Sequence, residues 1–86
     1  MAKVVEMMAQ KQVSIFEKKM HWNSTPAHKV IRFIKKDAHE LNRMNARHKT
    51  VDIFFETLQL ANRLKINLDK ELSKHMKDAK KKYGAV

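Results

Sequence analysis

The chain has 86 residues and a formal net charge of +10, because 19 Lys and Arg outnumber 9 Asp and Glu. This length allows one small domain over residues 1–86, and an apolar content of 43% is too high for a disordered basic tail. The absence of Cys excludes disulfides and thiolate chemistry, and one Gly and one Pro argue against a turn-rich β fold. Nothing is apolar enough to span a membrane or to form the core of a signal peptide. We therefore expect a soluble, cytoplasmic, all-helical domain whose small core favours self-association.

The first half of the chain predicts two amphipathic helices. The first covers about residues 3–20 and has an apolar face at three- and four-residue steps: Val5, Met8, Ala9, Gln12, Phe16 and Met20. Thr25 and Pro26 then predict an N-cap followed by Pro at the first helical position. The second helix follows, with an apolar stripe within an arc of roughly 100°. That stripe consists of Ala27, Val30, Ile31, Ile34, Ala38 and Leu41.

The second half predicts two more helices after a polar connection at residues 42–49. The third, at about residues 50–64, is apolar over most of its circumference, which is typical of a central helix or an oligomer interface. The fourth follows Asn67 as N-cap and ends before Gly84, with Lys residues in its last turn. Its apolar stripe consists of Leu68, Leu72, Met76, Ala79 and Tyr83. The fold class expected is a four-helix bundle.

Three carboxylates are candidates for a metal site. Asp37 and Glu40 lie one turn apart on the second helix, and Asp37 borders the apolar stripe. Asp52 is near the start of the third helix, so antiparallel packing would bring it opposite this pair. Inward carboxylates from two helices form the all-oxygen site that Mg²⁺ or Mn²⁺ prefers. The alternative is that Asp37 and Glu40 pair with a Lys or Arg of a neighbouring helix.

Several stretches resemble the MazG-like all-α nucleoside triphosphate pyrophosphohydrolases. These stretches are residues 22–26, residues 37–41 and the Leu-Ala-Asn-Arg-Leu-x-Ile-x-Leu pattern of residues 60–68, which is the most specific part. The resemblance covers about residues 22–83. It implies a four-helix fold that forms homodimers or homotetramers. It also implies Mg²⁺-dependent hydrolysis of nucleoside triphosphates to a monophosphate and pyrophosphate.

The resemblance also suggests which residues would act. The family's E-x-x-E motif corresponds to Asp37-x-x-Glu40, and its E-x-x-D motif corresponds to Lys49-x-x-Asp52. Asp37, Glu40 and Asp52 would therefore be the catalytic metal ligands. Lys49 departs from the family pattern, because an ammonium has no lone pair and repels Mg²⁺.

Two further residues follow from this departure. Glu56, one turn beyond Asp52, would be a substitute metal ligand. Lys36 stands where the family commonly has another Glu, so Lys36 and Lys49 are candidate phosphate contacts in a protein that binds nucleotides without hydrolysing them.

A basic surface offers a second class of function. The second helix is basic on the face opposite its apolar stripe, and the residues that follow it extend that surface. The basic residues are Lys29, Arg32, Lys35, Lys36, His39, Arg43, Arg47, His48 and Lys49. Such a surface suits the nucleic-acid backbone or another acidic partner, although a solvated face is the simpler interpretation. Trp22 either stacks on a nucleobase or seals the junction of two helices. The sequence therefore leaves open an enzyme and a binding protein.

Overall fold

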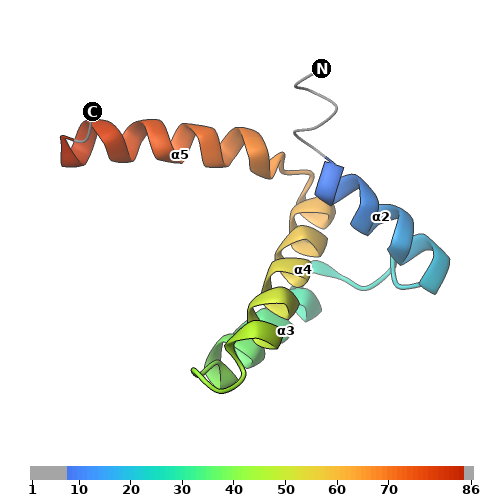
Figure 1. Ribbon diagram of the computed structural model, residues 1–86. Helices are drawn as coiled ribbons and strands as arrows, with labels where there is room; N and C mark the ends of the chain where they lie inside the picture. The colour runs from blue at the N-terminus through green and yellow to red at the C-terminus, as the bar shows by residue number, and fades with distance from the viewer. Residues whose placement is uncertain (1–7, 85–86) are drawn as a thin grey trace.

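A computed structural model describes residues 8–84, which form four α-helices and no strand (Figure 1). The helices are α2 (Met8–Met20), α3 (Ala27–Glu40), α4 (Ala46–Leu64) and α5 (Leu68–Tyr83). The prediction of an all-helical chain with four helices is confirmed. The predicted beginning of the first helix, including Val5, lies outside the described residues. Within residues 8–84, no helix is long and apolar enough to cross a membrane.

Helix α4 is central, because α2 and α3 both pack on it. Helix α3 runs antiparallel to α4, with a short connection closed by two Asn side chains. Asn42 Oδ1 accepts from the backbone N–H groups of Met44 and Asn45 at 2.8 and 3.0 Å, and Asn45 Oδ1 accepts from Asn42 N–H at 2.9 Å. The connection is therefore shorter than predicted: α4 begins at Ala46 instead of about residue 50. This earlier start places Lys49 on the first turn of α4.

The start of α3 also differs slightly from the prediction. Pro26 is the N-cap, with an extended ψ of 157°, and Ala27 is the first helical residue. The Pro26 carbonyl oxygen accepts from the N–H groups of Lys29 and Val30, which closes the first turn of α3. Because Pro26 has no N–H, this end of the helix has one donor fewer to satisfy.

Helix α2 presents a different face to the core than its apolar pattern predicts. Gln10, Val13 and Glu17 are buried against α4, whereas Phe16 and Met20 of the predicted apolar face are more than two-fifths exposed. Polar partners on α4 satisfy the two buried polar side chains of α2, as described below. The apolar core is correspondingly small and consists of Val13, Val30, Leu58 and Ala61.

Helix α5 begins and ends as predicted but projects away from the other helices (Figure 1). Asn67 Oδ1 accepts from Lys70 N–H at 3.1 Å, and Gly84 takes the left-handed conformation just past the last turn. Lys65, in the turn between α4 and α5, also has a positive φ of 56°. The radius of gyration is 14.8 Å, whereas a compact chain of this length has about 12 Å. The four helices thus do not close into a compact bundle within one chain.

Candidate functional site

The antiparallel packing of α3 and α4 joins Asp37, Glu40 and Lys49. Lys49 Nζ lies 2.9 Å from Asp37 Oδ1 and 2.7 Å from Glu40 Oε1, so one ammonium donates to both carboxylates. The Asp37 side chain is 14% exposed and that of Glu40 is 42% exposed, which places the cluster at the edge of the α3–α4 interface. The two acids are therefore paired with a cation of the neighbouring helix. This is the alternative to a metal site that the sequence left open.

This arrangement stabilises the charged form of all three groups. Hydrogen bonding to Lys49 is the main reason that the pKa values of Asp37 and Glu40 lie below their ordinary values. The same bonds, first to Glu40 and then to Asp37, raise the pKa of Lys49. Lys49 therefore stays protonated, and the acids stay ionised, throughout the physiological pH range.

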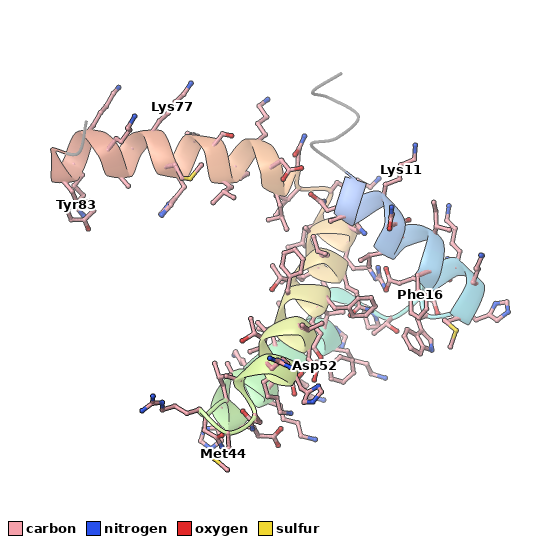
Figure 2. The ribbon with its side chains drawn as sticks, viewed as in Figure 1. Lys11, Phe16, Met44, Asp52, Lys77 and Tyr83 are labelled. Atoms are coloured by element: carbon pink, nitrogen blue, oxygen red, sulfur yellow. The ribbon has the colours of Figure 1, made fainter. Side chains whose placement is uncertain are left out.

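Glu56 lies beside this cluster, and its carboxyl group ionises less readily than those of Asp37 and Glu40. Its Oε1 atom is buried and has no hydrogen-bond partner. Burial raises the pKa of Glu56 to about 7, and hydrogen bonding to Asp37 and the negative charges of Asp37 and Asp52 contribute further. Asp52 itself is exposed on the surface of α4 (Figure 2). The acidic residues of the two helices are thus near one another, but only Asp37 and Glu40 share a partner.

Replacing Glu56 with Gln is expected to stabilise the protein above pH 7 and to change little below pH 4.5. Because the pKa of Glu56 is raised to about 7 from 4.5, its contribution to stability is fully present below the unfolded value. It is lost as the pH rises towards 7, where the folded state must also ionise a buried carboxyl. The uncharged amide avoids this loss.

Urea unfolding of the two proteins at a pH below 4.5 and a pH above 7 measures this effect. Gln12→Glu, which adds an exposed acid on α2, is the control and should leave the pH profile unchanged. Parallel pH profiles for the wild type and Glu56→Gln would show that Glu56 ionises normally in the folded state.

A Mg²⁺ ion at this cluster would need an open position between the carboxylates. The Lys49 ammonium occupies the space between the two carboxylates that a cation would bridge. Among residues 8–84, no three His, Asp or Glu side chains converge on one point where an ion would bind. As arranged, these residues do not fit a resident Mg²⁺ ion, and coordination would require Lys49 to move. The catalytic and metal-binding roles of Asp37, Glu40 and Asp52 stay predictions. The role of Glu56 as a substitute metal ligand also stays a prediction.

The basic residues of α3 remain exposed while its acids are paired. Lys29, Arg32, Lys35, Lys36 and His39 are all exposed on α3, and Arg43, Arg47 and His48 continue the surface beyond its C-terminal end. None of these residues takes part in an ion pair among the described side chains. Lys49 differs from them, because two of its three donors are already engaged by Asp37 and Glu40.

Trp22 lies at the junction between α2 and α3. Its ring packs edge-to-face on Phe16 at a centroid distance of 5.5 Å, and Phe16 in turn packs on Phe55 of α4. The indole is still 42% exposed. Its contacts favour a residue that seals the junction, and its role in stacking a base stays a prediction.

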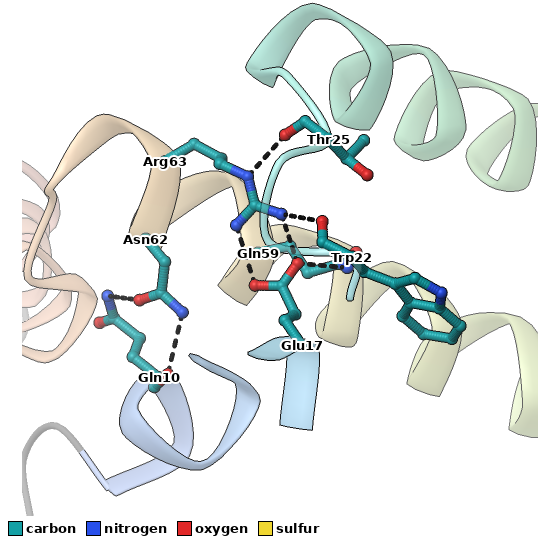
Figure 3. A network of polar contacts seen from close by, with 7 residues as sticks. All are labelled: Gln10, Glu17, Trp22, Thr25, Gln59, Asn62 and Arg63. Carbon is teal, nitrogen blue, oxygen red and sulfur yellow. Dashed lines mark hydrogen bonds and ion pairs between the residues drawn. The ribbon is translucent and has the colours of Figure 1, made fainter. Parts of the chain in front are cut away.

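A buried polar network, which the sequence reasoning missed, holds α2 on α4 (Figure 3). Arg63 donates to both carboxylate oxygens of the fully buried Glu17, and also to the carbonyl oxygens of Thr25 and Trp22 at 2.6 and 3.0 Å. Gln59 Nε2 donates to Glu17 at 2.9 Å. The bonds to Glu17 are the main reason that the pKa of Arg63 is raised.

The second part of the network is uncharged. Gln10 Nε2 donates to the Ile66 carbonyl oxygen at 2.7 Å and to Asn62 Oδ1 at 3.2 Å, while Asn62 Nδ2 donates to the Gln10 carbonyl oxygen at 2.9 Å. Gln10 Oε1 accepts from Leu68 N–H at 2.8 Å, which ties the start of α5 to α2. Gln10 and Glu17 stand seven residues apart, a helical repeat that could have revealed a polar face directed at the polar side of α4.

Comparison with protein-family models, with curated proteins and with solved structures finds no match for this chain.

Proposed function

We propose that this chain is a MazG-like helical protein that binds the phosphate backbone of a nucleic acid through the basic face of α3. The proposal rests on a difference between the acidic and the basic side chains of α3. Lys49 pairs with the acids Asp37 and Glu40, whereas the Lys and Arg side chains of α3 remain exposed and outside the ion pairs of the described residues. The face therefore presents positive charge to a polyanion.

The spacing of these cations favours a polynucleotide over a single nucleotide. Lys29, Arg32 and Lys36 follow one another at about one turn, and His39 continues the row. The row from residue 29 to residue 39 extends over about 15 Å. A row of this length matches consecutive phosphates along a strand better than the clustered phosphates of one triphosphate. In the family that the chain resembles, the working unit is a homodimer or homotetramer, and we extend that proposal to this chain.

Reversing two charges on this face is expected to weaken nucleic-acid binding roughly 10- to 100-fold. The variant is Arg32→Glu with Lys36→Glu, and fluorescence anisotropy with a labelled single-stranded oligonucleotide measures the dissociation constant. Both side chains are exposed, so the fold should be retained. The loss is expected to be uniform across oligonucleotide sequences, because phosphate contacts do not read bases.

The matched control carries Lys74→Glu and Lys77→Glu, which change the net charge equally on the polar side of α5. The control should bind nearly as tightly as the wild type. Equal losses of affinity in the two variants would mean that only the total charge of the chain matters. Absence of binding by the wild type would contradict the proposal.

Hydrolysis of nucleoside triphosphates is the second candidate function. It is favoured by the influence of Asp37 and Asp52 on the pKa of Glu56, which places three acids within electrostatic reach of one another. Such acids would hold Mg²⁺ and orient an attacking water if Lys49 left the cluster.

Pyrophosphate release in the presence of Mg²⁺ distinguishes the two candidates. We expect no turnover by the wild type, and increased Mg²⁺ affinity in Lys49→Glu, because the substitution replaces the competing cation with a carboxylate. Turnover by the wild type that disappears in Asp37→Ala would instead establish the hydrolase and show that Lys49 does not close the site.

A further inference from the structure

Helix α5 carries an apolar stripe that its own chain leaves uncovered. No residue of α5 is buried; Leu72 and Met76 are each 55% exposed, and Tyr83 is 75% exposed. At 3.6 residues per turn, the stripe occupies an arc of about 80°. Figure 2 shows Lys77 and Tyr83 on opposite sides of α5, so the side of the helix that faces away from Tyr83 carries a charged residue. The stripe consists of Leu68, Leu72, Met76, Ala79 and Tyr83.

The exposed area of the chain is also larger than that of a compact monomer. The accessible surface is 7446 Å², whereas a folded monomer of this mass exposes about 5,300 Å². A stable interface buries about 800 Å² on each partner. The excess surface is therefore sufficient for an interface of ordinary size.

We infer that α5 docks antiparallel on α5 of a second copy of this chain. The charges that flank the stripe select this occupant. Glu71 and Lys82 lie on one flank, and Asp69 and Lys80 lie on the other, with the acid near the start and the cation near the end of the helix in each case. Two antiparallel helices bring like flanks together, so Glu71 lies beside Lys82 of the second copy and Asp69 lies beside Lys80.

The same two-fold arrangement also brings the apolar residues of the two stripes into contact with one another. With the axis beside Met76, Leu68 lies next to Tyr83 of the second copy, and Leu72 lies next to Ala79. His75 and Asp78, on the same flank as Glu71, then lie next to each other across the axis. A parallel pair would instead bring Glu71 towards Asp69 and Lys82 towards Lys80, and these like charges would repel. Charge therefore determines the orientation as well as the partner.

A groove at the start of α5 would receive the end of the second helix. It has a volume of about 600 Å³ and lies between α2, α4 and α5, with Phe54, Leu58, Leu68 and Leu72 among its lining residues. In the antiparallel pair, Tyr83 of the second copy reaches Leu68 at this groove. Phe54 is 56% exposed in the single chain and would be covered there, which extends the interface onto α4.

Sedimentation equilibrium on the full chain tests the inference. We expect a dimer, and we expect Met76→Glu to raise its dissociation constant at least about 100-fold, because each copy loses one buried apolar side chain and gains a charge. The control Lys77→Gln changes the net charge by the same amount on the opposite face and should leave the dimer intact. A wild-type chain that stays monomeric at all concentrations would overturn the inference.

Exchanging the charges of Glu71 and Lys82 shows whether a weakened dimer results from lost ion pairs or from an unfolded helix. Glu71→Lys alone and Lys82→Glu alone should each weaken the dimer several-fold, and the two together should restore it, because both pairs are then reversed across the axis. Failure of the double variant to recover would overturn the antiparallel arrangement.

Disulfide formation gives the orientation independently, since the chain has no Cys of its own. Met76→Cys, near the axis, should form a covalent dimer on oxidation, whereas Ala79→Cys should not. Ready formation of a covalent dimer by Ala79→Cys would instead indicate a parallel pair.

Discussion

Replacing Arg63 with Met is expected to lower the free energy of unfolding by about 3–5 kcal/mol, the usual effect of removing one partner of a buried ion pair. Glu17 is 1% exposed, and Arg63 supplies bonds to both of its carboxylate oxygens. The variant would keep this carboxylate buried with Gln59 as its remaining partner. Arg63 also donates to the Thr25 and Trp22 carbonyl oxygens, so its loss would loosen the turn between α2 and α3 as well. With so few buried apolar side chains, this loss would leave little of the native stability.

Urea unfolding followed by circular dichroism measures this change. Lys11→Met, an exposed cation on α2, is the control and should have little effect. Glu17→Met combined with Arg63→Met should be less damaging than Arg63→Met alone, because no unpaired charge is then left buried. If the single and double variants lose equal stability, the loss would come from packing and not from the isolated carboxylate.

Nucleic-acid binding is expected to fall roughly 1,000-fold when the salt concentration rises tenfold. Each phosphate neutralised on a single strand contributes about −0.7 to the slope of log K against log salt. The three exposed Lys and Arg side chains of the contact row, together with one exposed Arg just beyond the end of α3, give a slope of about −3. These side chains are Lys29, Arg32, Lys36 and Arg43.

Anisotropy titrations at several salt concentrations measure this slope. Removing one contact, as in Lys36→Ala, should reduce its magnitude by about 0.7, whereas Lys77→Ala should leave it unchanged. A slope near zero would show that binding depends on contacts other than phosphate neutralisation, and would contradict the role of the α3 face.

Much of the local structure could be predicted from the sequence, because local interactions determine it. The start of α5 follows from the Asn67 side chain, and its end follows from Gly84 in the left-handed conformation. The start of α4 could not be placed by apolar periodicity, since Ala46 to Lys49 carry no apolar stripe. Hydrogen bonds between Asn42 and Asn45 determined it.

The spacing in the sequence predicted that Asp37 and Glu40 lie together, but not that Lys49 lies between them. Asp37 and Glu40 are one turn apart by their spacing alone, and Lys49 was recognised as a cation at a position where the resembled family has an acid. That Lys49 lies between the two carboxylates depends on the length of the α3–α4 turn and on the packing of the two helices. A single sequence gives neither quantity.

The sequence by itself determined the all-helical class, the caps of α5 and the basic face of α3, because each depends on residues within a few turns of one another. Only the tertiary structure decided that α2 buries Gln10 and Glu17 while Phe16 and Met20 stay largely exposed. Apolar periodicity ranks faces by hydrophobicity, but a buried polar face becomes favourable when partners such as Asn62 and Arg63 satisfy its hydrogen bonds. Those partners lie about fifty residues away in the chain, so their effect arises only when the helices pack.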